Sequence, residues 1–382
     1  MSSRENPQPY FTPQMTNLLK GVAVVFMMIH HFFTFPEWYI PGIAYPELSG
    51  FAAHFQEPFK ICVVVFAFIT GYVYYFQPRK TYGYSMRKIT DLLVSYWVVL
   101  IPFTLLAIGL GCYSFDLPGF LLELFALKRP IMFFCWYVCF YCVAMLLLPL
   151  LVKFIPEDKP AAALFIGILV PSIALPVLGQ IPGLRTDPIW LAVVNNARAW
   201  FPSVVMGYLF AQFNWFGMVF DQIFQRNLNK RCQKVVVWML LILAAFLGRE
   251  FCPSFTLGSL EVLGREAALT LPMDLFYGPC FLYGTLKLFT VRKLEGLGRV
   301  FVVLGKLSLP MWFVSCLFFN ACSPVTQPLL YAPRQPVLVL LWGLLLCFVM
   351  AIPADRAAKA INRHKNRLFD PLRFTKKEDK LR

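Results

Sequence analysis

The chain of 382 residues is strongly apolar, since 59% of its residues are hydrophobic and only 14% are charged. A soluble domain carries roughly 25% charged residues and could not bury this much apolar surface, so the composition excludes a soluble globular fold. The formal net charge of +15 indicates membrane topology and contact with lipid, and no nucleic-acid partner is expected.

The apolar residues occur in about ten windows that approach the ~17 to 25 residues needed to cross a hydrocarbon core. The predicted spans lie near residues 17–35, 59–76, 89–111, 131–154, 161–180, 199–213, 235–247, 269–288, 300–322 and 336–352. No internal repeat and no polar region large enough for a second folded domain accompany them. We therefore predict an all-α integral membrane bundle of about ten transmembrane helices, with a membrane domain at 1–355 and a basic tail at 356–382.

Lys and Arg cluster in alternate loops, at residues 79–88, 226–234 and 292–299. Short cytoplasmic loops collect basic residues, so these loops and both termini are predicted to be cytoplasmic. The basic tail is predicted to be a solvated, lipid-facing segment on the same side. The N-terminus has no cleavable signal pattern, so the first span is expected to be retained. The prediction is a multi-pass protein of the cell (plasma) membrane.

Cysteines and prolines within the spans have structural interpretations. Most cysteines lie in apolar segments and are interpreted as small hydrophobic residues without Cys/His metal spacing, so no metal site is expected. Prolines inside spans, such as Pro202 and Pro310, predict either broken helices that line a wet cavity or kinks relieved by neighbouring helices.

The first span contains three ionisable side chains, Lys20, His30 and His31. Such a group deep in a bilayer costs at least ~2.5 kcal/mol on insertion scales, so it normally faces the bundle interior. Lys20 and His31 are eleven residues apart, close to three helical turns, which predicts one shared face with ~16 Å between them along the axis.

These residue types suit a transfer reaction. Imidazole accepts a hydroxyl proton near neutral pH, so His31 and His30 are the candidate catalytic residues, and Lys20 suits an anionic donor on the cytoplasmic side. The alternative is that the histidines are hydrogen-bonded packing residues and that Lys20 extends to the lipid headgroups.

Three further stretches extend the pattern to other spans: FAFITGY at 66–72, WYVCFY at 136–141 and GKLS at 305–308. With Lys20 and His31, the chain resembles the membrane acyltransferase-3 family, whose first helix carries an Arg, ten residues and then a His. The resemblance follows the same order along nearly the whole chain. Lys20 stands in place of that Arg, and Ser315 stands where many members have a second His.

The resemblance implies an O-acyltransferase that moves an acyl group, most often acetyl, from cytoplasmic acyl-CoA to a hydroxyl of a cell-surface or lipid-linked polysaccharide. No bound cofactor is implied. Lys20, Arg87 and Lys88 would bind the phosphates of CoA, and Arg299 and Lys306 are further candidates for the same role. His31 would act as general base, which we prefer, or as a transient acyl carrier.

Supporting roles are expected for Trp136, Tyr137 and Ser308 in the matching stretches. An acid near the outer end of a span, Glu57, Glu250 or Asp274, would orient the imidazole. The expected partners are acyl-CoA, a glycan acceptor and membrane lipid, and self-association into a homo-oligomer is left open.

Two other classes of protein compete with this interpretation. A transporter or flippase of a glycan or small metabolite also has many spans and buried ionisable groups, although no inverted repeat is found and Asp274 is the clearest acid inside a span. A non-catalytic scaffold subunit would need no buried base.

Overall fold

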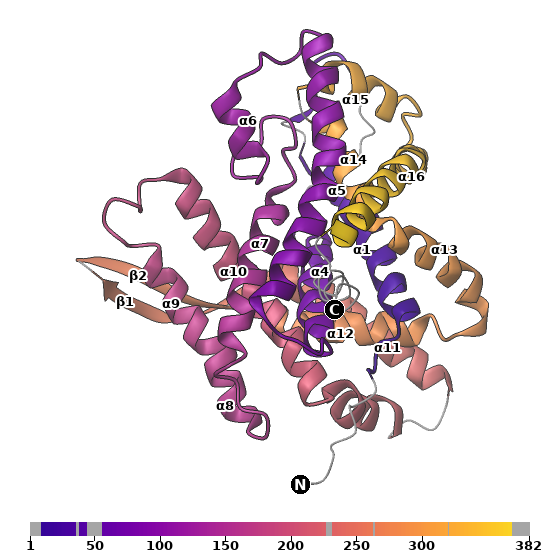
Figure 1. The fold of residues 1–382 in the computed structure, drawn as a ribbon. Coiled ribbons are helices and arrows are strands. Elements are labelled where there is room, and N and C mark those ends of the chain that lie inside the picture. The colour runs from indigo at the N-terminus through magenta and orange to yellow at the C-terminus, as the bar shows by residue number, and fades with distance from the viewer. Residues whose placement is uncertain are drawn as a thin grey trace, which may run out of the picture.

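The computed structural model describes residues 9–35, 38–43, 56–226, 231–262, 264–319 and 321–368, and this part of the chain is mostly helical (Figure 1). The helices are α1 (Pro13–Phe33), α3 (Gln56–Phe59), α4 (Ile61–Tyr75), α5 (Tyr82–Gly109), α6 (Leu117–Glu123), α7 (Trp136–Leu151), α8 (Pro160–Leu164), α9 (Val170–Leu178), α10 (Pro188–Gln212), α11 (Arg231–Phe251), α12 (Asp274–Leu288), α13 (Glu295–Lys306), α14 (Ser308–Ser315), α15 (Ser323–Tyr331) and α16 (Pro336–Leu368). Short π-helical segments, Phe165–Leu169, Phe216–Phe220 and Gln222–Arg226, and 3₁₀ segments, Arg292–Leu294 and Cys316–Phe319, extend or join them.

The helices confirm a membrane protein. Five of the described helical segments are long and apolar enough to cross a bilayer: Pro13–Phe33, Glu57–Tyr75, Tyr82–Gly109, Pro160–Leu178 and Pro336–Asn366. The number rises to seven if each of two bent helix pairs is counted as one span. The shorter α7 and α12 have 16 and 15 residues, fewer than the ~20 that a hydrocarbon core requires. Ten spans and cytoplasmic termini therefore remain predictions.

A small antiparallel hairpin departs from the all-α prediction. Strand β1 (Ser254–Val262) pairs with β2 (Arg265–Pro272), and the pairing is irregular between Thr256 and Gly258. Gly264 follows the strand with a φ of +74°, a backbone conformation that favours glycine. The strand β2 occupies the first residues of the span predicted at 269–288, so that helix begins later, at Asp274.

Proline has different effects at its two predicted break sites. The span predicted at 300–322 bends by 68° between α13 and α14, and Pro310 lies directly after this bend. Proline has no N–H to bond the carbonyl four residues earlier, so Pro310 leaves the Lys306 carbonyl at this bend without its helical partner. Pro202, in contrast, lies inside the continuous helix α10.

Glycines bring pairs of helices close together. A Cβ on Gly71 of α4 would lie 1.7 Å from the Val204 carbonyl oxygen of α10, and a Cβ on Gly305 of α13 would lie 1.7 Å from the Asn17 oxygen of α1. Only glycine permits these backbone contacts, which is a common way for membrane helices to associate. Gly71 and Gly305 belong to two of the stretches that resemble the acyltransferase-3 family, so part of that pattern records helix packing.

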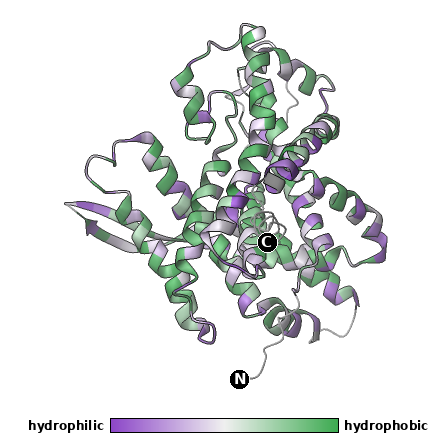
Figure 2. Cartoon of the chain, viewed as in Figure 1, coloured by the Kyte–Doolittle hydropathy of each residue, from purple (hydrophilic) through white to green (hydrophobic). Residues whose placement is uncertain are grey.

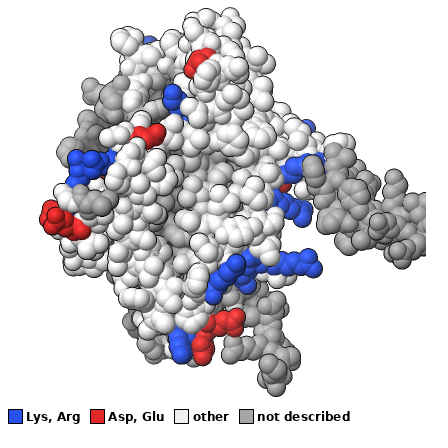
Figure 3. All heavy atoms as spheres, turned by 60° about the vertical axis from the view of Figure 1, so that its left-hand side comes forward, with Lys and Arg blue, Asp and Glu red and all other residues white. Residues whose placement is uncertain are grey.

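The outer surface suits lipid. Large apolar side chains point outward, such as Leu105 of α5 and Val337 of α16, which are 65% and 69% exposed. Figure 2 shows hydrophobic residues along most helices and hydrophilic residues on the hairpin and near several helix ends. In the view of Figure 3, charged atoms form a few separate groups on a largely uncharged surface. Soluble monomers rarely expose such continuous apolar area.

The last helix differs from the predicted solvated tail. α16 continues without a break across residue 355, where the membrane domain was predicted to end, and reaches Leu368. Its Lys365 forms an ion pair of 2.7 Å with Asp91 of α5. The described part of the tail is thus a helix packed on the bundle.

Candidate functional site

A cavity of about 1260 Å³ lies between α1, α4, α5, α7, α14 and α16. Its wall contains seven basic side chains, Lys20, Lys60, Lys88, Arg129, Lys306, Lys359 and Arg363, and two acids, Asp91 and Asp355. Both acids are paired with lysines, at 2.7 Å in each case. The wall therefore carries an excess of positive charge that favours an anionic ligand.

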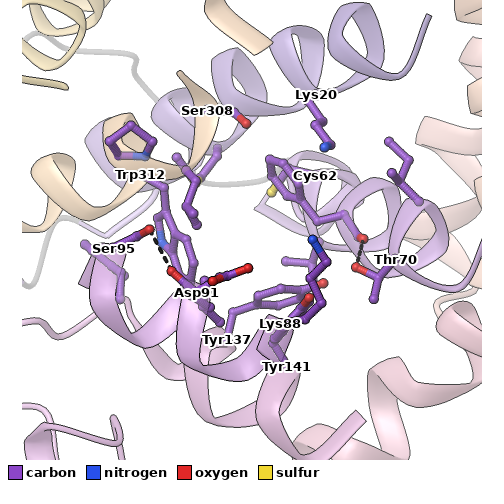
Figure 4. A pocket seen from close by; sticks show the side chains of 18 of the residues that line it. Lys20, Cys62, Thr70, Lys88, Asp91, Ser95, Tyr137, Tyr141, Ser308 and Trp312 are labelled. Atoms are coloured by element: carbon purple, nitrogen blue, oxygen red, sulfur yellow. Dashed lines mark hydrogen bonds between the residues drawn. The ribbon is translucent and has the colours of Figure 1, made fainter. Parts of the chain in front are cut away.

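The basic end of the cavity is built around Lys20. Figure 4 shows Lys20 of α1 and Lys88 of α5 pointing into the same space, with Ser308 of α14 on the wall nearby. Lys20 is half-buried and forms no ion pair within the part of the chain that the structure describes. Lys306 is placed next to α1 by the contact of Gly305 with that helix. These amines can bind phosphate oxygens through charge-assisted hydrogen bonds.

The histidines line the same cavity farther along α1. His31 is 6% exposed, and its ring stacks on Phe134 with 3.9 Å between ring centroids and 9° between the planes. Its Nδ1 atom is buried and has no hydrogen-bond partner among the described residues. The ring of His30 lies edge-on to Phe35 at 4.9 Å, and its Nδ1 lies 3.3 Å from Thr34 Oγ1. Packing on Phe134, rather than a carboxylate, therefore fixes the imidazole of His31.

The predicted orienting acids bind elsewhere. Asp274 is buried and pairs with Nη1 of Arg249, whose Nη2 lies 3.8 Å from Glu57 Oε2. The Nε of Arg249 donates a hydrogen bond of 2.9 Å to the backbone oxygen of Glu57. Within the described residues neither acid pairs with His31, and both bind the Arg249 guanidinium instead.

This ion network borders the cavity. Glu57 also pairs with Lys60, and the Arg249 guanidinium lies 5.8 Å from the centre of the Trp200 ring. Lys60 and Trp200 both line the cavity. The network thus fixes two wall residues without itself facing the interior.

Most of the remaining predicted residues line the cavity and one does not. Trp136 lies 6.0 Å from Trp200 between ring centroids, and Tyr137 lies 5.8 Å from Trp312. All four of these rings belong to the wall. Arg87 is exposed and is absent from the wall, so the structure does not bring it to Lys20 and Lys88.

Ser315 occupies the position where the resemblance expects a second histidine. It is fully buried in α14, and its hydroxyl donates a hydrogen bond of 2.7 Å to the Trp312 carbonyl oxygen. It does not line the cavity. The side chain therefore satisfies a local backbone acceptor here.

Sequence reasoning missed four basic wall residues. Lys60 lies at the start of a predicted span, Arg129 lies in a predicted loop, and Lys359 and Arg363 belong to the segment predicted to be a solvated tail. The spacing of Asp355, Lys359 and Arg363 at every fourth position was an available signal, because residues four apart share a helix face. No cluster of three or more metal-ligating side chains occurs among the described residues.

A family model described as an acyltransferase domain matches residues 16–354. The match covers nearly the whole chain and confirms the resemblance derived from the motifs. It includes Lys20, both cavity histidines and Ser308, but it ends before the last turns of α16. Comparisons with curated proteins and with solved structures found no significant match.

Proposed function

Because the chain belongs to the acyltransferase-3 family and is a membrane O-acyltransferase, we propose that it moves an acetyl group from cytoplasmic acetyl-CoA to a hydroxyl of a cell-surface or lipid-linked polysaccharide. One observation carries this proposal: a single cavity is lined by Lys20 and Lys88 on one part of its wall and by His30 and His31 on another. A polyanionic donor and a base for its acceptor can therefore meet in one space.

The donor binds with its phosphates at Lys20, Lys88 and Lys306 in this proposal. CoA carries its thioester at the end of a long arm, remote from its phosphates. Along α1 the distance from Lys20 to His31 is ~16 Å for eleven residues of helix. Anchoring the phosphates at the basic end therefore directs the thioester towards the histidines, and much of the catalytic gain comes from this positioning.

His31 is the general base. Its imidazole takes the proton of the acceptor hydroxyl while that oxygen attacks the thioester carbonyl carbon. The carbon–sulfur bond then breaks, and the CoA thiolate takes the proton back from the imidazolium. Stacking on Phe134 supports this role because it holds the ring in one orientation. His30, also on the cavity wall, is the second candidate for the same role.

The basic loops and both termini are assigned to the cytoplasm of a plasma-membrane protein. The basic segment at residues 79–88 includes the first turns of α5 and Lys88, so the basic end of the cavity faces the compartment that holds acyl-CoA. The histidines then lie towards the outer side, where polysaccharide acceptors are found.

The test is donor turnover by protein purified in detergent, supplied with acetyl-CoA labelled in the acetyl group and a glycan extract. Release of CoA together with labelled glycan supports acyl transfer. A protein that binds the glycan but neither binds nor consumes acetyl-CoA would favour the transporter interpretation.

A further inference from the structure

The last turns of α16 line the cavity beyond the end of the family match. The match ends at residue 354, whereas α16 continues to Leu368. The wall residues in this extension are Asp355, Ala358, Lys359, Asn362, Arg363 and Asn366. Each of them lies three or four positions from another member of the set, so all six share one helix face. This part of the wall therefore lies outside the region that matches the family.

Specific contacts attach the extension to α5. The Nζ of Lys365 lies 2.7 Å from Asp91 Oδ1 and 2.9 Å from Thr90 Oγ1. Asn362 Nδ2 donates a hydrogen bond of 3.2 Å to the Asp91 backbone oxygen. Asp91 lies one helical turn after Lys88, and both residues line the cavity. The contacts therefore hold the extension beside the basic end of the cavity.

Two cations of the extension lie at the exposed part of the wall. The side chain of Lys359 is 64% exposed and pairs with Asp355 at 2.7 Å, and Arg363 is also exposed. Lys20 and Lys88, in contrast, are half-buried. These four basic residues thus form an inner pair, Lys20 and Lys88, and an outer pair, Lys359 and Arg363.

We propose that Lys359 and Arg363 bind the 3′-phosphate of the acyl-CoA donor, which makes the extension of α16 a specificity element for the donor. This inference rests on the proposed function. A donor that enters with its thioester arm first leaves the ribose 3′-phosphate outermost, where the outer pair lies. The inner pair, Lys20 and Lys88, then meets the pyrophosphate. A guanidinium and an ammonium supply the charge-assisted hydrogen bonds that a terminal phosphate needs.

The test compares acetyl-CoA with 3′-dephospho-acetyl-CoA as donors for the full-length purified protein. The wild type should show a KM for the dephospho donor about tenfold higher, a modest factor because the cations are exposed. The Lys359→Gln/Arg363→Gln double variant should raise the KM for acetyl-CoA by about the same factor and lose the preference, with kcat at saturation unchanged. Arg356→Gln changes an exposed cation of the same helix that does not line the cavity, and it should behave as wild type.

The outcomes separate the two proposals. A double variant that is active and keeps both the wild-type KM and the donor preference overturns the role of α16 and leaves the acyltransferase proposal standing. A wild-type protein that consumes neither donor overturns both.

Discussion

The ion pair of Arg249 and Asp274 allows a quantitative test of the packing around the cavity. Both side chains are buried, at 2% and 7% exposure. Replacing Arg249 by Met would leave the Asp274 carboxylate buried without its cation, and replacing Asp274 by Leu would leave the guanidinium with Glu57 alone. Breaking a buried pair from one side costs about 3–5 kcal/mol.

The Arg249→Met/Asp274→Leu double variant should be much more stable than either single variant. The attraction within a buried pair is largely offset by the cost of removing both charges from water, so apolar replacements of similar size are often near neutral. Glu57 would keep its ion pair with Lys60. We expect the double variant to lie within about 2 kcal/mol of wild type.

The assay is reversible unfolding in mixed detergent and SDS micelles, followed by tryptophan fluorescence, for the wild type and the three variants. The reasoning is refuted if the double variant is as unstable as the two single losses added together, since the two charges would then contribute independently. A cost below about 1 kcal/mol for Arg249→Met would also contradict it.

Three further predictions concern other parts of the structure. Gly305→Ala should prevent recovery of folded protein, because its Cβ would lie 1.7 Å from a backbone oxygen of α1. Gly296→Ala in the same helix should be tolerated, because its Cβ meets nothing within 4 Å. Size-exclusion profiles of the two purified variants test this difference. Burial raises the pKa of Glu123 from 4.5 to about 7, so between these two pH values the folded state holds a proton that the unfolded chain has lost. The free energy of unfolding should therefore fall as pH rises from 4.5 to about 7, by up to about 3 kcal/mol. A Glu123→Gln variant should show no such fall in thermal unfolding. Lys20→Ala should raise the KM for acetyl-CoA by about tenfold or more. Arg87→Ala should leave this KM unchanged, because Arg87 lies outside the cavity wall. An equal rise in KM for the two variants would remove Lys20 from the donor site.

The sequence alone predicts much of the cavity because its signals are local. The helical period places Lys20 and His31 on one face, and both line the same cavity in the structure. The order of the family-like stretches brings Trp136 and Ser308 to that wall as well. Hydropathy correctly identifies a helical membrane protein, because apolar windows long enough to cross a bilayer are rare in soluble folds.

The remaining features depend on contacts between distant parts of the chain. Asp274 was predicted to serve His31, but its partner Arg249 lies 25 residues away on another helix. The tail was predicted to be solvated because it is basic, whereas its position depends on Lys365 reaching Asp91, 274 residues away. A hydropathy window also cannot separate a β-strand from the start of a helix, so β2 was included in a predicted span.

Acyl transfer by a His31→Ala variant is the most direct test of the central claim that His31 is the catalytic base. His364→Ala is the matched control, because His364 is exposed on α16 and does not line the cavity. Equal amounts of purified wild type and both variants receive labelled acetyl-CoA and glycan extract. A general base contributes about 10²–10⁴-fold to the rate, so His31→Ala should transfer label to glycan at least ~100-fold more slowly than wild type. His364→Ala should transfer it at the wild-type rate. Transfer by His31→Ala at close to the wild-type rate would contradict the account.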